Sequence, residues 1–598
     1  MSEKKLIHPC KDSIENLISS ETKYMFMVGA GISIDPPAGL LPATQFIQYL
    51  LELCAPAEEI QNLLSIKTLR YEMICEMLQR YIDYELEFMD YFEFGTEPNL
   101  IHYFLAKAII EGHAVYTTNF DYLIEHALEK LVPQDKISQI FPVITETDYE
   151  FNQDPFKTHK NGMFPLYKLH GAKKNIITNI KTRDSLITTM SAFGKDDYVL
   201  SLKPFKRLSL MGASKNKTLI IMGYSGSDDF DIAPVLRILF DIKNIIWIDH
   251  HQKDSIDIFE FDPKAAFVIP KGLSRTERLL AEISSNTEAR VIMVKANTNK
   301  LIENNLWRLL FEDEIVPELD LSKDSNVPPF QKWINEKFPN IPEILKWKSA
   351  ADMYLELGFR EDLLRCAQEG LKISQDKSVP KMEAKFINLM GVYHYNEKEF
   401  DQALSFFEKA REINRELGNQ QLEAGQINNI GLIHLEKGNY DKAMEAFEEA
   451  FKIAQGRGDY IGMATRLNNM GLAFLKQKNF KDALEKFEEA LKFDKKTGEL
   501  AGRVIRLTNI GHAHKAQEKF SDALESYRKA YQIVQKLSDR VNMGKILIEM
   551  GKTHADMGDI GKAITNINKA IDLLKEIDDK ITLFEAMETL KGVKKLLN

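Results

Sequence analysis

The sequence has few cysteines and no long apolar run, and both shortages restrict what the chain can be. Only four cysteines occur in 598 residues, and none of them forms a C-x-x-C pair. This spacing supports neither a structural zinc ribbon nor a disulfide framework. No stretch approaches the roughly 20 apolar residues of a membrane helix, and residues 1–13 lack the apolar core of a secretory signal. We therefore expect a cytoplasmic protein with reduced thiols, no metal ion and no membrane partner.

The chain also has no excess of basic over acidic residues. The chain has 78 Lys and Arg against 88 Asp and Glu, which gives a net charge of −10. General nucleic-acid binding leaves a basic footprint, so we do not expect it here. An apolar content of 44% and a charged content of 28% are ordinary for a globular protein, and the length suggests about three or four structural units.

Six short apolar runs in the first half alternate with segments of helical periodicity. They cover residues 24–28, 114–117, 165–169, 218–222, 245–248 and 291–294. Strands this apolar, separated by helices, are typical of a parallel sheet that is covered on both faces. We therefore predict an α/β domain over residues 1–295, with a Rossmann-like, doubly wound parallel sheet and a helical insertion at about residues 43–112.

Glycine and polar residues directly follow five of these runs. The first run leads into Gly29-Ala30-Gly31-Ile32-Ser33, the second into Thr117-Thr118-Asn119-Phe120-Asp121, the third into His170-Gly171, the fourth into Gly223-Tyr224-Ser225 and the fifth into Asp249. Ligands bind at the carboxyl edge of an open parallel sheet, and glycine lets the backbone approach a pyrophosphate because it has no Cβ. Ile34 takes the place of the third glycine of a G-x-G-x-x-G fingerprint, so the first loop alone does not identify a dinucleotide site.

In order and spacing, the first three motifs resemble the NAD-binding core of sirtuins over about residues 15–295. The resemblance implies that the glycine loop holds the pyrophosphate, that Asn119 lies at the nicotinamide ribose and that Asp121 bonds the carboxamide. It implies His170 as the general base. The contacts that it implies with NAD are Gly29, Ala30, Gly31, Ser33, Thr117, Asp121, Gly223, Ser225 and Asp249.

Two departures from the sirtuin pattern bear on the activity. Residues 172–215 contain no cysteine, so the zinc ribbon that follows the catalytic histidine of sirtuin deacylases is missing. Leu41-Pro42-Ala43-Thr44 stands where these enzymes have Pro-Asp-Phe-Arg. Because the zinc module helps to form the acyl-lysine groove, its absence argues against deacylation.

This combination is similar to the sirtuin-like NAD hydrolases of bacterial anti-phage defence. The resemblance implies an NAD⁺ glycohydrolase that releases nicotinamide and ADP-ribose as an abortive-infection effector. A protein deacylase and a non-catalytic NAD or nucleotide sensor remain alternatives, and cyclisation of ADP-ribose competes with hydrolysis as the outcome.

Each polar residue of these motifs also has a plainer interpretation. Asn119 could cap the helix expected from residue 122, since asparagine is a favoured cap. Asp121 could be a first-turn acid that faces the helix dipole, and His170 could be a surface side chain at a strand-ending turn. The sequence leaves these interpretations open. The joint occurrence of three motifs at one sheet edge is what favours the NAD site.

A period of 40 residues dominates the second half of the chain. The repeated positions include Gly391, Gly431, Gly471, Gly511 and Gly551, as well as Ala403, Ala443, Ala483, Ala523 and Ala563. Internal periods of this length indicate helical units that bury their faces against neighbouring units. The pattern resembles the tetratricopeptide repeat in a 40-residue form. We assign residues 296–345 to a proline-punctuated connector and residues 346–598 to an α-solenoid that ends in a capping helix.

Asn429, Asn469 and Asn509 occupy the same position in three successive units. The tetratricopeptide resemblance implies protein or peptide binding, and such a ladder resembles the one that grips a partner's backbone in long-repeat members. The alternative is that these amides bond to each other across adjacent helices. The resemblance to defence hydrolases further implies a protein or peptide trigger on the repeat groove and assembly into a homo-oligomer.

Overall fold

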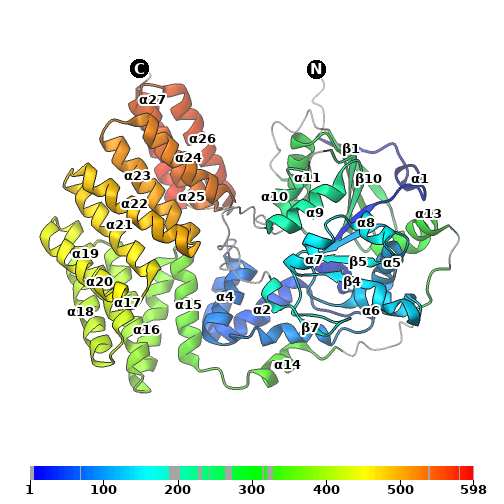
Figure 1. Ribbon diagram of the computed structural model, residues 1–598, viewed down its shortest axis with the longest axis horizontal. Helices are drawn as coiled ribbons and strands as arrows, with labels where there is room; N and C mark the ends of the chain where they lie inside the picture. Colours follow the sequence, from blue (N-terminus) through cyan, green and yellow to red (C-terminus); the bar gives the residue numbers. More distant parts are fainter. Residues whose placement is uncertain are drawn as a thin grey trace. The chain divides into compact units, whose positions relative to one another are not determined.

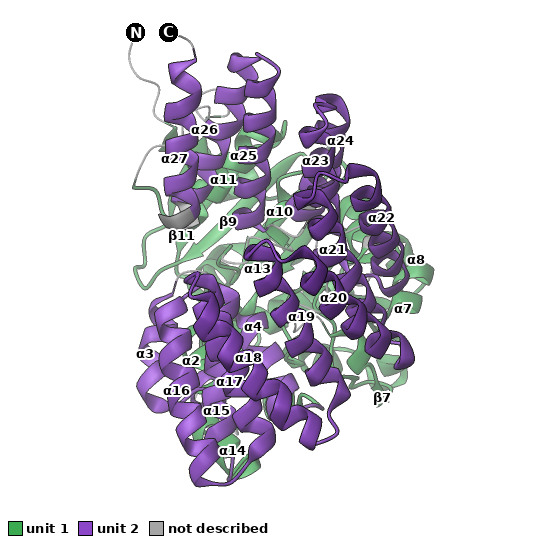
Figure 2. Cartoon of the chain, turned by 90° about the vertical axis from the view of Figure 1, so that its left-hand side faces the viewer, with its two compact units in different colours: residues 1–49, 85–188, 200–339 green, residues 50–84, 189–199, 340–598 purple. Residues whose placement is uncertain are grey.

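The structure is a computed structural model that describes residues 6–66, 69–186, 202–226, 232–239, 241–262, 272–312, 315–319, 327–536, 539–577 and 580–596. The chain forms two compact units (Figure 2). The described residues of the first unit lie within 1–49, 85–188 and 200–339, and those of the second lie within 50–84 and 340–598. Residues 50–84, which the sequence assigns to the α/β half, therefore group by contact with the repeats.

A nine-stranded sheet organises the described part of the first unit, in the order β1-β10-β11-β9-β8-β2-β3-β5-β4. Its strands are β1 (Ile7–Pro9), β2 (Met25–Val28), β3 (Ala114–Thr117), β4 (Ile140–Val143), β5 (Phe164–Lys168), β8 (Thr218–Met222), β9 (Asn244–His250), β10 (Asp257–Phe261) and β11 (Arg290–Ala296). The pairings from β11 to β4 are parallel, and β10 and β1 add an antiparallel edge. The predicted parallel sheet is confirmed, and the sequence missed β1, β4 and β10.

The central strands are buried on both faces, which explains their apolar composition. In β2, Phe26 and Val28 face a core built with α5 (Leu100–Ile110), α6 (Leu123–Leu131) and α13 (Trp307–Phe311). Met25 and Met27 face the opposite core, built with α9 (Pro204–Ser214), α10 (Ile232–Leu236) and α11 (Arg275–Asn286). Alternate side chains of one strand thus enter different layers, and the sheet is doubly wound, as predicted (Figure 1).

The chain reverses direction across the sheet at β2. After β2 the chain forms β3, β4 and β5 on one side of it, and with β8 it crosses to the other side, where β9, β10 and β11 follow. The carboxyl ends of β2 and β8 therefore flank a topological switch point, which is where open α/β sheets bind ligands.

Shorter helices and two small strands complete the first unit and the insertion. They are α1 (Ile14–Leu17), η1 (Ala30–Ser33), α2 (Ala43–Cys54), α3 (Ala57–Ser65), α4 (Tyr71–Tyr81), η2 (Glu87–Glu93), η3 (Gln134–Gln139), α7 (Glu146–Phe151), α8 (Pro155–Lys160), β6 (Lys174–Asn175), β7 (Ile180–Lys181), η4 (Arg183–Ser185), α12 (Thr298–Leu301), η6 (Ile302–Leu306) and α14 (Phe330–Lys337). The expected helical insertion is present as α2, α3, α4, η2 and α5.

Antiparallel helix pairs form most of the second unit. They run through α15 (Glu343–Leu357), α16 (Arg360–Asp376), α17 (Pro380–Asn396), α18 (Phe400–Glu416), α19 (Gln420–Glu436), α20 (Tyr440–Gly456), α21 (Tyr460–Lys476), α22 (Phe480–Thr497), α23 (Leu500–Ala516), α24 (Phe520–Lys536), α25 (Arg540–Asp556), α26 (Ile560–Ile577) and α27 (Lys580–Lys595). Figure 1 shows this array in green to red. The predicted helical repeat array is confirmed.

The 40-residue period arises from close packing within each helix pair. A Cβ on Gly431 would lie 2.6 Å from Cε1 of Phe447, and a Cβ on Gly471 would lie 2.6 Å from Cε1 of Phe487. The glycine of the first helix thus makes room for an aromatic ring on the second helix.

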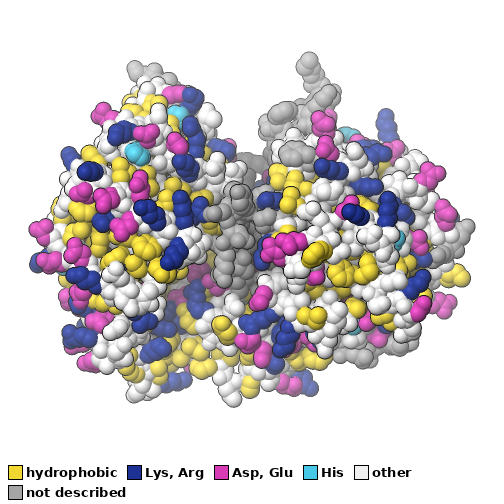
Figure 3. Space-filling model, in the orientation of Figure 1, with side chains coloured by type: hydrophobic (Ala, Val, Ile, Leu, Met, Phe, Trp, Pro, Cys, Tyr) yellow, Lys and Arg dark blue, Asp and Glu magenta, His cyan; other side chains and the backbone are white. Residues whose placement is uncertain are grey.

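None of the described helices is long and apolar enough to cross a membrane. Acidic and basic side chains are interspersed over the face seen in Figure 3.

Candidate functional site

Two glycine loops meet at the switch point. The Gly31 amide donates to the Gly223 carbonyl at 2.8 Å, and the Gly29 amide donates to the Met222 carbonyl at 3.2 Å. A Cβ on either Gly29 or Gly31 would lie 2.8 Å from the Gly223 oxygen. Gly223 itself has φ +66°, and its Cβ would lie 2.5 Å from Cγ2 of Ile32. The glycines are therefore required for the loops to approach each other, and Ala30 and Gly31 stay exposed at the rim.

Three of the predicted site residues form one buried cluster behind this loop. Ser33 Oγ donates to Asp121 Oδ2 at 2.9 Å. The side-chain amide of Asn119 donates to the same Asp121 oxygen at 3.1 Å and to Ser33 Oγ at 3.2 Å. The structure therefore brings together the first and second sequence motifs, which are separated by 86 residues at Ser33 and Asn119.

His102, which the sequence analysis did not single out, completes the cluster. Its Nε2 lies 3.1 Å from Ser33 Oγ, and its Nδ1 accepts from the Asn99 amide at 3.2 Å. Burial lowers the pKa of His102 to about 4, although the Asp121 carboxylate opposes this shift. His102 is therefore neutral near pH 7, and its Nδ1 carries the lone pair because an amide N–H points at it.

These contacts assign every proton in the cluster. The remaining proton of His102 is on Nε2 and is donated to Ser33 Oγ, so the Ser33 hydroxyl is free to donate to Asp121. Asn99 adds a capping box at the start of α5 and also donates from Nδ2 to the Ile32 carbonyl at 2.7 Å. The signal in the sequence was the Asn99-x-x-His102 spacing ahead of an apolar helix.

The orientation of Asn119 leaves one polar atom without a partner. Because Nδ2 is held by Ser33 and Asp121, the other side-chain atom must be the oxygen. Asn119 is only 5% exposed, and its Oδ1 makes no hydrogen bond within the described part of the chain. A buried polar atom without a partner costs about 1–3 kcal/mol. This oxygen is therefore a ready acceptor for a donor group on a ligand.

The contacts of Asn119 and Asp121 bear on their plainer interpretations as a helix cap and a first-turn acid. Thr117 Oγ1 accepts from the Asn119 amide at 3.0 Å, so Thr117 stabilises the turn after β3. The amide at the start of α6, that of Leu123, is bonded at 3.2 Å by Asp121 Oδ1 and not by Asn119. Asp121 thus supports the helix start and organises Ser33 and Asn119 at the same time.

His170 follows the neighbouring strand β5. Thr117 of β3 lies opposite Lys168 of β5, and the Leu169 amide donates to the Thr117 carbonyl at 2.8 Å. Asn119 and His170 are therefore each two residues beyond a paired position on adjacent parallel strands. The His170 ring lies 5.9 Å from the Phe120 ring, centroid to centroid, and the side chain is partly exposed.

Gly171 and two buried lysines fix the loops around His170. Gly171 has φ +78°, and a Cβ there would lie 2.2 Å from the Ser185 carbonyl oxygen. Lys168 is fully buried, forms an ion pair with Glu125 at 2.9 Å and donates to the Asp121 carbonyl at 2.6 Å. Lys206 donates to the Leu169 carbonyl at 2.7 Å. The sequence missed both lysines, because a lysine in an apolar strand gives no signal of its partner.

The remaining predicted residues lie along the same carboxyl edge, on the other side of the switch point. Ser225 is exposed after β8, and its carbonyl accepts from Thr276 Oγ1 at 3.3 Å. Asp249 is partly buried in β9, opposite Lys295 of β11. The structure therefore arranges the predicted residues in two groups, over β3 and β5 and over β8 and β9, with the glycine loop between them.

A second buried amide oxygen without a partner lies near the glycine loop. Asn299 of α12 donates from Nδ2 to Asp35 Oδ2 at 2.7 Å, while its Oδ1 makes no hydrogen bond within the described part of the chain. The Asp35 carbonyl in turn accepts from Asn99 Nδ2 at 3.1 Å. Asn299 could not be selected from its sequence context, because an asparagine at a helix start is usually a cap.

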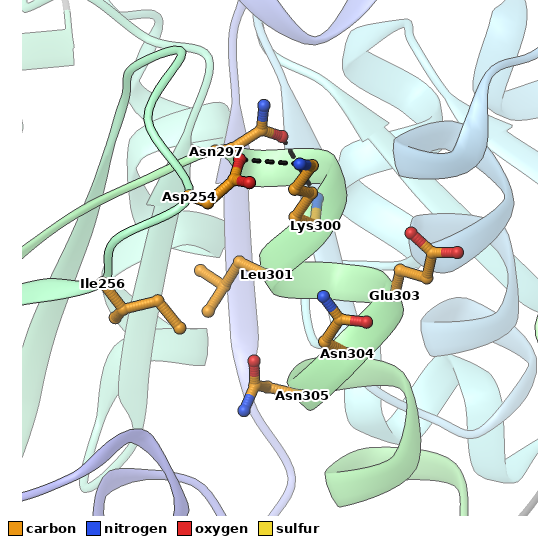
Figure 4. Close-up of a pocket in the computed structure, with 8 residues that line it drawn as sticks. All are labelled: Asp254, Ile256, Asn297, Lys300, Leu301, Glu303, Asn304 and Asn305. Atoms are coloured by element: carbon orange, nitrogen blue, oxygen red, sulfur yellow. Dashed lines mark hydrogen bonds and ion pairs between the residues drawn. The ribbon is translucent and has the colours of Figure 1, made fainter.

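A cavity of about 230 Å³ lies apart from these loops, between the segment after β9 and the helices α12 and η6 (Figure 4). It is lined by Asp254, Ile256, Asn297, Lys300, Leu301, Glu303, Asn304 and Asn305. Lys300 and Asp254 form an ion pair of 2.6 Å at its rim. None of the predicted site residues contributes to this cavity.

Within the described ranges, no group of three or more His, Cys, Asp or Glu side chains is placed to hold a metal ion.

In the repeats, the three asparagines of the ladder bond to asparagines of the preceding unit. Asn469 Nδ2 donates to Asn428 Oδ1 at 2.8 Å, and Asn509 Nδ2 donates to Asn468 Oδ1 at 2.8 Å. Asn429 makes the equivalent bond of 3.4 Å with Asn388. The structure thus shows cross-helix bonding, which is the second of the two alternatives left open by the sequence. It adds Asn388, Asn428 and Asn468 to the ladder.

Known protein families match a segment of each half of the chain. Residues 113–245 match the model of a SIR2-like domain, and residues 423–496 and 503–576 match the tetratricopeptide repeat. None of the curated proteins matches the chain.

Among solved structures, BtubC from P. vanneervenii is similar with 20% identity and a TM-score of 0.32, covering 37% of this chain and 92% of that one. The apo form of the quorum sensor NprR from B. thuringiensis has 16% identity and a TM-score of 0.32, covering 43% and 73%. Aspartyl phosphate phosphatase F from Bacillus subtilis has 17% identity and a TM-score of 0.33, covering 45% and 77%.

Proposed function

We propose that this chain, which joins a SIR2-like domain to tetratricopeptide repeats, is an NAD⁺ glycohydrolase that cleaves NAD into nicotinamide and ADP-ribose. The observation that carries the proposal is the buried Oδ1 of Asn119, which has no partner within the described residues. Its amide nitrogen is held by Ser33 and Asp121, so the oxygen is oriented before any ligand arrives. Such preorganisation is what a positioned water or ribose hydroxyl requires.

The arrangement of the loops supports a dinucleotide that spans the switch point. We place the pyrophosphate at Ala30 and Gly31, which are exposed at the rim of the loop after β2. The nicotinamide ribose then lies over β3 and β5, toward Asn119 and His170. The adenosine half lies over β8 and β9, toward Ser225 and Asp249, whose carboxylate can accept from a ribose hydroxyl.

The proposed chemistry needs little more than positioning and one proton acceptor. Nicotinamide is a good leaving group, and C1 of the ribose passes through an oxocarbenium-like state as the glycosidic bond breaks. Asn119 Oδ1 accepts from the attacking water or from a ribose hydroxyl and orients it. His170, which is partly exposed, takes the proton. General-base catalysis of this kind contributes about 10²- to 10⁴-fold.

The repeats support regulation and not catalysis in this proposal. We propose that a protein or peptide trigger binds the repeat array, that the chain assembles into a homo-oligomer, and that the cytoplasmic enzyme depletes NAD in an anti-phage, abortive-infection response. These elements rest on the resemblance to defence hydrolases and on the presence of a repeat array beside the SIR2-like domain.

Product analysis separates this proposal from its alternatives. The full chain is incubated with NAD, with and without an acetyl-lysine peptide, and products are resolved by liquid chromatography. The proposal expects nicotinamide and ADP-ribose in equal amounts, without any need for the peptide. Turnover that requires the peptide and yields an acetylated ADP-ribose would establish a deacylase. Tight NAD binding without cleavage would favour a sensor, and a cyclic product would mean that an internal nucleophile replaces water.

A further inference from the structure

The helical insertion over residues 43–93 begins and ends beside the buried cluster. In the chain it follows Ser33 and precedes Asn99 and His102. Ser33 and His102 are in contact at 3.1 Å, and Asn99 Nδ2 is bonded to the Ile32 carbonyl at 2.7 Å. The two ends of the insertion are therefore joined at the candidate site, and any displacement of the insertion acts on both sides of this junction.

The outer part of the insertion is bonded to the first repeat pair, within the second unit. Glu59 of α3 is 2% exposed and accepts from Arg365 of α16 at 2.8 Å and 2.6 Å, one bond to each oxygen. Tyr354 of α15 donates to Glu59 at 2.7 Å. Burial would raise the pKa of Glu59, but the bonds from Arg365 and Tyr354 outweigh it and lower the pKa. Glu59 is therefore ionised, and removal of Arg365 would leave a buried carboxylate without its charged partner.

A second buried contact joins α4 to α15. Asp352 is 7% exposed and pairs with Lys348 at 2.5 Å, and the Tyr81 hydroxyl of α4 also donates to Asp352. Lys348 donates to the Tyr81 oxygen at 3.2 Å. Two helices of the insertion are thus attached to the repeats at two separate, charged and buried points. A change in the position of α15 and α16 must move α3 and α4 with them.

The inner part of the insertion contacts the loop of His170 through aromatic rings, within the first unit. Phe46 of α2 lies 4.7 Å from Phe330 of α14 and 5.3 Å from Phe92, ring centroid to ring centroid. Phe92 lies 6.1 Å from Phe120, and Phe120 lies 5.9 Å from His170. Such ring pairs are attractive beyond the burial of their surface. The base of the insertion therefore helps to fix the side chain proposed as general base.

The helix α2 links the two parts. It is one continuous helix from Ala43 to Cys54, and the border between the two units falls within it, between Tyr49 and Leu50. Close-packed cores deform little, so packed elements that are displaced switch between discrete arrangements. A displacement of one end of α2 is therefore expected to reach the other end.

We propose that the insertion over residues 43–93 transmits the state of the first repeat pair to the Ser33–His102 junction and to His170, so that a trigger bound to the repeats regulates the candidate site. This rests on the proposed function for its enzymatic consequence, but the mechanical coupling is independent of it. The coupling is a free energy shared between two sites, which mutation can measure.

Hydrogen exchange on the full chain tests the coupling without any turnover. The variants are Arg365→Met, Glu59→Gln and the double variant, with Arg506→Met as a matched control. Arg506 forms a buried pair with Asp494 at 3.2 Å elsewhere in the array. We expect Arg365→Met to speed exchange about tenfold in peptides covering residues 29–35 and 99–106. Arg506→Met should leave these peptides as in the wild type, and Glu59→Gln should reproduce the effect non-additively with Arg365→Met.

Wild-type exchange at both peptides in folded Arg365→Met would overturn the proposal, as would an equal effect of Arg506→Met. Lys348→Gln provides a second variant at the other attachment point if Arg365→Met fails to fold, and the same two peptides are followed. Nicotinamide release is measured in parallel. Altered exchange in the variants without NAD cleavage by the wild type would contradict the proposed function and support the coupling. NAD cleavage by the wild type with unaltered exchange in the variants would support the proposed function and contradict the coupling.

Discussion

At the scale of single residues, the buried cluster of Ser33, His102, Asn119 and Asp121 depends on His102 being uncharged. Its Nδ1 must accept from the Asn99 amide, and its Nε2 must donate to Ser33. A proton on Nδ1 would place two N–H groups against each other. The network is therefore stable only while the ring is neutral, and this makes its stability depend on pH.

We predict that acid weakens the fold through His102. The unfolded chain binds a proton at the ordinary histidine pKa of about 6.5, whereas burial lowers the pKa of folded His102 to about 4. As pH falls between these values, the unfolded state binds the proton first, so the free energy of unfolding falls, by on the order of 3 kcal/mol. Urea denaturation between pH 7 and pH 4.5 measures this loss.

The variant His102→Gln isolates this effect from the other histidines. It should lower stability at pH 7, because polar groups of the cluster lose a partner, and it should show a shallower decline toward acid pH than the wild type. An identical decline in both proteins would mean that another group titrates. Burial also lowers the pKa of His113 to about 3. His113 therefore contributes its own decline in stability toward acid pH in both proteins, and the variant removes only the part that is due to His102.

How far the sequence predicts this cluster differs from residue to residue. Asn119, Asp121 and Ser33 stand in motifs that are visible in the chain, and the structure brings them together. His102 and Asn299 were missed because their significance lies in contacts with residues far along the chain. The sequence shows a capping signature at Asn99, but it cannot show that the third residue of that helix turns its ring toward Ser33, 69 residues away.

At the scale of secondary structure elements, the parallel strands were predictable because each is a short run of apolar residues buried on both faces. β4 was missed because Pro142 interrupts its sequence; the strand lies at the end of the sheet, where proline is tolerated. β1 and β10 form the opposite edge, and their side chains are exposed or partly exposed apart from that of Phe261. Edge strands lack the continuous apolar pattern that identifies the central ones.

Two glycines in one repeat helix give a matched test of how the array packs. Both Gly425 and Gly431 lie in α19. A Cβ on Gly431 would lie 2.6 Å from the Phe447 ring, whereas a Cβ on Gly425 would meet nothing within 4 Å. Gly431→Ala should therefore destabilise the array by about 1–3 kcal/mol through overpacking. Gly425→Ala should stabilise it by about 0.5–1 kcal/mol, because alanine is the better helix former.

Chemical denaturation of the two variants, monitored by circular dichroism at 222 nm, checks this prediction. The opposite signs are the essential result, since both changes add the same methyl group to the same helix. Equal stabilisation by both would show that Phe447 moves aside at no cost, and the glycine period would then need another cause.

At the scale of the whole molecule, the chain is divided by contact into two units whose borders are not those of its sequence segments. Residues 50–84 group with the repeats, where Glu59 meets Arg365, 306 residues further along the chain. The sequence shows a helical segment there, but its polar face gives no sign of a partner at that distance. Sequence periodicity predicted both architectures and could not predict this attachment.

We predict two calorimetric transitions in the full chain, one for each unit. Gly431→Ala should lower the temperature of the repeat transition and so identify it. NAD should raise the other transition, because a ligand that binds only the folded state adds about 2.7 kcal/mol at 100 times its Kd. A single transition would contradict separate unfolding of the two units, and a shift of the repeat transition alone would contradict the placement of the NAD site in the first unit.

The most direct test of the account is the rate of nicotinamide release from NAD by the full chain, compared with the variants Asn119→Ala and His170→Ala. We predict multiple turnovers by the wild type and a loss of about 10²- to 10⁴-fold in kcat for His170→Ala, with a comparable loss for Asn119→Ala and little change in NAD binding measured by calorimetry. Unchanged turnover in both variants, or NAD binding by the wild type without any release of nicotinamide, would contradict the account.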